Sequence, residues 1–273
     1  MKRLISIIIL TQLTFLHADN YSLSFAGDAD YVNINAAAVF DLSDEQQLTI
    51  SAYIKVDGNN EVIFQAEQSF GYYIGTHDDG EFALTLYFDG FEDLCLSNTQ
   101  ITDGEWHYVT GTYNGSEMSI YVDGVLENTC GAGVLVSQDG VSPITIGAYR
   151  PGSSSYQFDG LIDELNIWDT ALSQSQIQSY MTTSPTGSES DLVGYWNFNE
   201  GSGATASDAT SNSNDGTIYG ATWSTDVPFS GTTTTSALTW SVQAQASIGS
   251  YNDNDNYLGV ASDATNTFDA SYD

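Results

Sequence analysis

Apolar and polar residues alternate along most of the first 170 residues in short runs. The runs are rich in β-branched and aromatic residues, and clusters of Gly, Asn, Asp and Ser separate them at intervals near ten residues. Such runs are typical of strands, whose side chains point alternately to two faces. Predicted strands occupy 21–25, 31–35, 48–56, 62–65, 82–88, 108–113, 118–124, 144–149 and 161–168. The spacing predicts an all-β fold, an antiparallel β-sandwich or jelly roll.

One short helix is predicted near 173–181. Ser173 suits the N-cap of the segment SQSQIQSYM, which carries Ile177 and Tyr180 on one side. After Pro185 a polar linker leads into a further patterned stretch at 192–223.

The two ends of the chain differ from this domain. Residues 1–18 combine a charged start, an apolar run and the small residue Ala18, which predicts a secretory signal peptide cleaved near that position. We therefore expect a secreted or cell-surface domain over 19–228. Residues 229–236, with GTTTTS, are typical of a linker, and 237–273 resemble the start of a further, truncated β-domain.

The charge balance narrows the possible partners. The chain has 36 Asp and Glu against four Lys and Arg, and two of those cations, Lys2 and Arg3, lie in the predicted signal peptide. Such a surface repels nucleic acid and anionic membranes, so we expect neither nucleic-acid binding nor membrane insertion. It suits divalent cations and salty surroundings. The abundant Tyr, Phe and Trp residues still provide for a large core.

The chain has two cysteines, Cys95 and Cys130. An even number of cysteines in an exported chain predicts one disulfide between them.

Several motifs occur in one order with sensible gaps: FAGDADYVNI, LTISAYIKV, DGEWHYVTGTYNGSEMSIYVDGVL, ITIGAY and FDGLIDELNIWDTALSQSQI. Together they resemble the LamG-like jelly-roll domain of the concanavalin A-like lectin/glucanase superfamily over about residues 20–182. The resemblance implies two curved antiparallel sheets, often with a Cys–Cys bridge and a structural calcium. It also implies a secreted multidomain surface protein of bacterial type.

The stretch 192–223 resembles the beginning of that family, yet here it follows the last strand. It either completes the first sandwich from its C-terminal end, as in a circular permutation, or begins a partial second repeat. We favour completion, because 237–273 do not continue a repeat.

Catalysis is not indicated. Strict alternation over 161–168 places Asp163 with Leu165 and Ile167 on one face and Glu164 on the other. Glycoside hydrolysis needs two carboxyl groups across one bond, so this strand alone assembles no pair. We expect no enzyme activity. After signal removal two histidines remain, His77 in a polar loop and His107, expected as a hydrogen-bonded strand residue.

Calcium is the predicted cofactor. It prefers six to eight oxygen ligands, and the turn GDAD at 27–30 supplies Asp28 and Asp30. In jelly rolls of this type the first and last strands commonly run side by side, which would bring this turn near Asp163. The family resemblance points to the same three ligands. The alternative is that these residues make only turn hydrogen bonds. A second oxygen-rich loop surrounds Asp208.

Aromatic residues near turns are the candidate ligand contacts. Tyr72, Tyr73 and Tyr149 are candidates for stacking on sugars, and Arg150 for holding an anionic group, with a local salt bridge as the alternative. Tyr87, Phe91 and Tyr156 also lie close to turns.

The sequence thus favours a secreted, non-catalytic module that binds a glycan or an extracellular protein, with a structural calcium. The alternatives are a glycan hydrolase or lyase of the same superfamily and a structural spacer of a surface adhesin.

Overall fold

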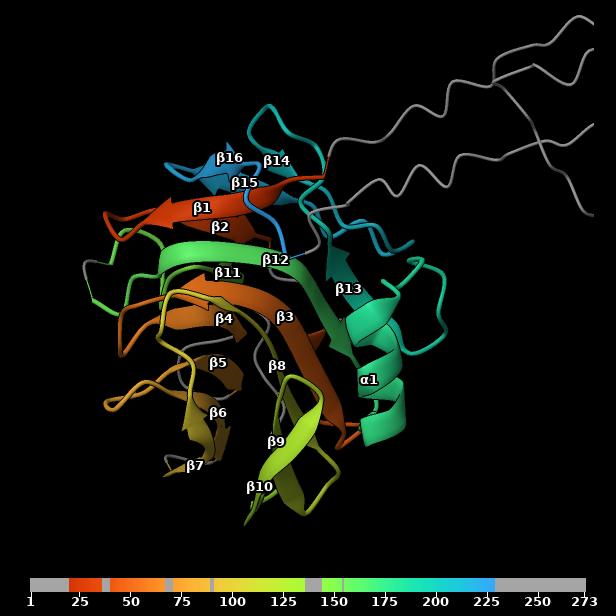
Figure 1. Cartoon of the computed structure of the whole chain (residues 1–273). Coiled ribbons are helices and arrows are strands. Elements are labelled where there is room, and N and C mark those ends of the chain that lie inside the picture. Colours follow the sequence, from red (N-terminus) through yellow and green to blue (C-terminus); the bar gives the residue numbers. More distant parts are fainter. Residues whose placement is uncertain are drawn as a thin grey trace, which may run out of the picture. The chain divides into compact units, whose positions relative to one another are not determined.

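A computed structural model describes residues 20–35, 40–66, 71–88, 91–135, 144–153 and 155–228 (Figure 1). The predicted signal peptide, the linker 229–236 and the segment 237–273 lie outside these residues. The described chain forms two antiparallel sheets, as predicted, and one helix. Within this part of the chain, no helix is long and apolar enough to cross a membrane.

The first sheet has eight strands, one of which pairs beside the main path. In order across the sheet they are β10 (Val125–Gly131), β9 (Glu117–Val122), β8 (Trp106–Tyr113), β3 (Leu48–Val56), β12 (Asp159–Trp168), β1 (Ser22–Ala26) and β16 (Thr222–Ser224), with β13 (Leu192–Trp196) beside β12.

The second sheet also has eight strands. They are β14 (Thr205–Ala206), β15 (Gly216–Tyr219), β2 (Tyr31–Ile34), β11 (Ile144–Ile146), β4 (Val62–Ala66), β5 (Tyr72–Thr76), β6 (Glu81–Phe88) and β7 (Phe91–Gln100).

The main core lies between the two sheets. Each strand contributes the residues of one face, so that Ile50 and Ile54 of β3 are fully buried in the same cluster as Ile74 and Leu84 of the second sheet. Burial of this apolar surface, at about 25 cal/mol per Å², is the main favourable contribution to folding. The outer faces of the two sheets do not contribute to this core, and they carry a second apolar cluster on the first sheet and a groove on the second.

The stretch 192–223 is part of this sandwich and does not form a second one. β13 pairs with the second half of β12, β15 pairs with β2, and β16 pairs with β1. Its side chains also enter the core, since Trp196 and Phe198 are fully buried there.

The helix α1 (Gln174–Thr182) covers the outer face of the first sheet (Figure 1). Ser173 is its N-cap residue, as predicted, and its backbone N–H donates to the Gln176 side chain. Ile177 is buried in a second apolar cluster, and Tyr180 packs on Trp168 with 4.7 Å between ring centroids. The residues of β12 under this helix are consequently shielded on both faces.

The predicted disulfide is confirmed. Cys95 in β7 bonds to Cys130 in β10, 35 residues further along the chain. These strands end the two sheets at the same side of the sandwich, so the bond ties one sheet to the other.

His107 is the hydrogen-bonded strand residue that the sequence predicts. Its ring nitrogens lie 3.0 Å from Asp123 and 3.2 Å from Asp103. The hydrogen bond to Asp123 raises the pKa of His107, while partial burial opposes this shift.

This pair of carboxylates makes stability depend on the charge of His107. A raised folded-state pKa means that the stabilisation is fully present below the unfolded pKa of about 6.5 and is lost as the pH rises through the folded value. We therefore expect His107→Gln to destabilise the protein at acidic pH and to have less effect at alkaline pH. Urea unfolding at both pH values measures this, and an equal loss at both would contradict it.

Candidate functional site

A groove of about 330 Å³ lies on the second sheet, on the face that points away from the core. Four tyrosines line it: Tyr73, Tyr87, Tyr149 and Tyr156. The other lining residues are Asn60, Glu61, Val62, Thr76, His77, Ala83 and Glu92. They come from β4 to β7, from the loops before β4 and between β5 and β6, and from the loop after β11.

Strand alternation selects which aromatic residues reach the groove. In β5 the ring of Tyr72 is fully buried in the core, whereas Tyr73, its neighbour, points to the groove. In β6 Leu84 and Leu86 face the core, so that Tyr87 is on the groove side.

The tyrosines form two ring pairs. The centroids of Tyr73 and Tyr87 lie 5.9 Å apart, and those of Tyr149 and Tyr156 are also 5.9 Å apart. Arg150 lies over the ring of Tyr149, with 5.2 Å from its guanidinium carbon to the centroid. The groove therefore offers aromatic surface from the sheet on one side and from a loop on the other.

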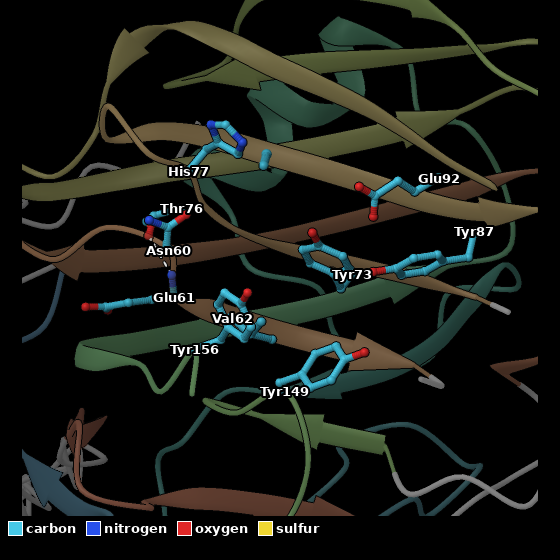
Figure 2. A pocket seen from close by; sticks show the side chains of 11 residues that line it. Asn60, Glu61, Val62, Tyr73, Thr76, His77, Tyr87, Glu92, Tyr149 and Tyr156 are labelled. Carbon is cyan, nitrogen blue, oxygen red and sulfur yellow. Dashed lines mark hydrogen bonds between the residues drawn. The ribbon is translucent and has the colours of Figure 1, made fainter. Parts of the chain in front are cut away.

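Figure 2 shows that the groove has two different ends. In this view Tyr73, Tyr87, Tyr149 and Glu92 lie at the right, Asn60, Glu61, Thr76 and His77 at the left, with Tyr156 between them. One end is thus aromatic with one carboxylate, and the other is polar.

Glu61 is the buried acid of the polar end. One carboxylate oxygen accepts a hydrogen bond from the backbone N–H of Asp159 at 2.9 Å, and the side chain is only 9% exposed. Burial raises the pKa of Glu61 to about 7, and the nearby carboxylate of Asp159 adds to the shift, against that hydrogen bond. At neutral pH this group is therefore able to donate or to accept a hydrogen bond.

Glu92 is the carboxylate of the aromatic end. It lies opposite Tyr87 in the β6–β7 ladder, and both side chains line the groove. Burial raises the pKa of Tyr73 and of Tyr87, and the charge of Glu92 contributes to both shifts. Both hydroxyls therefore stay protonated at physiological pH.

Two of the four predicted ligand contacts, Tyr73 and Tyr149, line this groove. Tyr72 was predicted to contact a ligand, and this is wrong because its side chain is fully buried. The Tyr72 hydroxyl donates a hydrogen bond to the Phe40 carbonyl. Arg150 is exposed and packs on Tyr149 without lining the groove.

The ligand contacts predicted from the sequence do not include two of the four tyrosines or either acid of the groove. For Tyr87 and Tyr156 the sequence indicates only a position close to turns. Alternation in 82–88 signals Tyr87, because that strand's Leu residues must face the core. Nothing local to the sequence marks Glu61 or Glu92, whose positions depend on neighbouring strands.

The three predicted calcium ligands do not share one site. β1 and β12 do run side by side, but Ala26 pairs with Asp159 and Leu23 pairs with Ile162. The turn that carries Asp28 and Asp30 follows Ala26, so it lies at the opposite end of this pairing from Asp163. Among the described residues no group of three His, Cys, Asp or Glu side chains is placed to hold a metal ion. The predicted ligand set is therefore wrong, and calcium binding by itself stays a prediction.

Two acids of these oxygen-rich loops make hydrogen bonds within the protein. The Asp30 side chain accepts a hydrogen bond from the Ala26 N–H at 2.9 Å, which is the turn interaction considered as the alternative. In the second oxygen-rich loop, Asp208 accepts from the backbone N–H groups of Tyr195, Thr210 and Asn214. Because N–H donors already surround this carboxylate, it holds the loop together.

The strict alternation predicted around Asp163 is also wrong. The register of β12 against β3 shifts between Asp163 and Asn166, and Glu164 has a φ of 53°. Such a bulge adds one residue to a strand and rotates the faces that follow. Ile162 and Leu165 both face the main core, so Asp163 and Glu164 both lie on the side under α1.

The two acids are therefore neighbours, but they are closed to substrates. Asp163 is fully buried and Glu164 is 8% exposed. Glu164 accepts a hydrogen bond from the Tyr195 hydroxyl at 2.5 Å. One oxygen of Asp163 accepts the Glu164 N–H, and the other has no hydrogen-bond partner in the part of the chain that the structure describes. Burial, together with the charge of Glu164, raises the pKa of Asp163 to about 9, so this carboxyl is neutral at physiological pH.

Curated relatives match part of the chain. The rat protein (Rattus norvegicus) named Sushi, von Willebrand factor type A, EGF and pentraxin domain-containing protein 1 is 30% identical over 132 residues, which are 42% of this chain. The mouse protein (Mus musculus) of the same name is 29% identical over 125 residues, or 39% of the chain. The chain spans only about 4% and 3% of the lengths of these proteins.

Solved structures share the fold. A protein from Bacteroides ovatus, provisionally described as carbohydrate binding, has a TM-score of 0.61 and 20% identity over 75% of this chain and 59% of its own. The SAP-like pentraxin of Limulus polyphemus has a TM-score of 0.50 and 19% identity, over 62% of this chain and 85% of its own.

At these identities the structures establish the architecture, while family membership comes from the sequence. Residues 26–178 match the family described as the Concanavalin A-like lectin/glucanases superfamily, which is more than half of the 273 residues. The matched segment runs from β1 to α1 and includes all four tyrosines of the groove. The chain belongs to the concanavalin A-like lectin/glucanase superfamily.

Proposed function

We propose that this chain is an extracellular, non-catalytic module that binds glycans in the groove on the second sheet. The observation that carries the proposal is the convergence of four tyrosines from two strands and one loop on one cavity. Aromatic faces provide apolar contact for the C–H surfaces of sugar rings, and the polar groups at both ends provide hydrogen bonds for hydroxyl groups.

A binding role fits the positions of the acids better than catalysis. Glycoside hydrolysis uses two carboxyl groups about 5 to 10 Å apart that flank one bond. Glu61 and Glu92 lie at opposite ends of the groove (Figure 2). The other close pair, Asp163 and Glu164, is buried beneath the helix layer.

Two further observations support the location and the ligand class. The pattern of residues 1–18 is that of a secretory signal, and the disulfide is of a kind that persists in oxidising surroundings. The description of the Bacteroides ovatus structure as carbohydrate binding makes glycans the first class to test.

Substitution of Tyr73 tests the proposal. We expect Tyr73→Ala to weaken binding of a glycan, first identified on an array, by about 10-fold or more, because a buried aromatic contact contributes roughly 1.5–3 kcal/mol. Isothermal titration calorimetry measures the change.

Tyr219→Ala is the matched control, since Tyr219 is an exposed tyrosine of β15 that stacks on Tyr31 outside the groove. Equal effects of both substitutions would place the glycan elsewhere. A folded chain that binds nothing on the array would favour the spacer alternative.

A further inference from the structure

We propose that the groove selects glycans that carry a protonated amino group, such as oligomers of glucosamine, over N-acetylated and acidic glycans. This inference rests on the proposed glycan binding and adds the chemical class of the ligand. Its basis is the combination of four tyrosine rings and two carboxyl groups in one groove.

The charges of the groove disfavour an anionic ligand. Its lining residues include the acidic Glu92 and, among the described residues, no Lys or Arg. Glu61, with a pKa of about 7, adds negative charge only as the pH rises through neutrality. The chain as a whole has a formal net charge of −32. An acidic sugar would meet repulsion both in the field of the protein and at the site itself. Neutral and cationic glycans are therefore the remaining candidate ligands of the groove.

The aromatic end of the groove favours the cationic ones. The face of a tyrosine ring attracts a cation within about 6 Å of its centroid. Arg150 already makes such a contact with Tyr149, at 5.2 Å, so a ligand cation at this end depends on the other rings. Tyr73 and Tyr87 add two further rings that pack against each other at this end.

Glu92 completes the site for an ammonium group. It is exposed, and it lies opposite Tyr87 in the ladder, at the aromatic end of the groove (Figure 2). An ammonium group placed against the rings of Tyr73 and Tyr87 would gain cation–π contacts together with an ion pair to Glu92. An N-acetyl group in the same place is neutral and gains neither.

The experiment compares three oligosaccharides of equal length by calorimetry with the full chain. They are a glucosamine tetramer, an N-acetylglucosamine tetramer and a tetramer of a uronic acid, at about pH 6, where amines are protonated. We expect the glucosamine tetramer to bind at least about tenfold more tightly than the acetylated one, which is about 1.4 kcal/mol. We expect no measurable binding of the acidic tetramer.

Glu92→Gln tests the named contact. It should reduce the preference for the amine over the acetylated form about fivefold or more. Glu117→Gln, an exposed acid of β9 in the other sheet, removes the same charge and should preserve the preference.

The outcomes separate the two proposals. Equal binding of the amine and acetylated tetramers, or an equal loss of preference in both variants, would overturn the inference and leave glycan binding intact. Failure of all three tetramers, and of every glycan on the array, would overturn the proposed function itself.

Discussion

Asp163→Asn is expected to make the stability of this protein much less dependent on pH. In the unfolded chain an Asp carboxyl has a pKa of about 3.9, whereas burial and the charge of Glu164 raise the pKa of folded Asp163 to about 9. Between these values the unfolded state has released a proton that the folded state keeps. The free energy of unfolding of the wild type therefore falls as the pH rises, by up to about 1.4 kcal/mol per unit from this group.

The substitution removes the titration but keeps the shape. Asn preserves the oxygen that accepts the Glu164 N–H at 2.8 Å, and it is uncharged at every pH. Over three pH units above pH 5 the difference between variant and wild type should change by up to about 4 kcal/mol in favour of the variant. Urea unfolding at pH 5 and at about pH 8 measures this change.

Asp28→Asn is the matched control. It removes the same chemical group from an exposed position outside this buried pair. The free energy of unfolding of this variant should change with pH in the same way as that of the wild type. If Asp163→Asn also ran parallel, the folded carboxyl would be ionised, as it would be beside a bound cation. Repeating the unfolding with calcium and with a chelator would then identify that cation, which also tests the calcium prediction.

Removal of the disulfide is expected to have an effect of similar size. A crosslink between residues 35 positions apart restricts the unfolded chain, and the chain-entropy relation gives about 4 kcal/mol for this separation. We therefore expect the double substitution Cys95→Ala and Cys130→Ala to lower the free energy of unfolding by more than that amount. Because Cys95 is fully buried, part of the loss comes from packing.

Reduced wild-type protein separates the two contributions. It lacks the bond but keeps both side chains, so it should unfold at a denaturant midpoint between those of the oxidised wild type and the double variant. Equal midpoints for the oxidised and reduced wild type would show that the bond does not contribute to stability.

Local pattern was sufficient for the main features of the fold. Runs such as 48–56 and 82–88 alternate because one face of a strand is buried, and the burial of Ile50, Ile54 and Leu84 follows from that rule. The cysteine pair and the helix near 173–181 also depend on short-range or compositional signals. The structure confirmed these predictions.

The same rule failed where the chain departs from a regular strand. The bulge at Glu164 changes the sheet face to which the side chains after it point. No residue type in FDGLIDELNIWD marks that change. β12 pairs with β1 along its first half and with β13 along its second half, and the bulge lies between the two. The bulge thus coincides with a change of partner strand, which a single segment of sequence does not contain.

By itself, the sequence determined many of the strands, the disulfide and the acidic character of this protein, because these depend on composition and on neighbours a few residues away. It missed β5, β7 and β10. Only the tertiary structure decided the function-bearing surface. It placed Tyr72 in the core and Tyr73 in the groove, and it joined Glu92 of β7 to Tyr149 and Tyr156 of a distant loop. It also separated Asp163 from the turn of Asp28 and Asp30. These arrangements depend on strand register and on loop packing, which are set by contacts between segments far apart in the chain.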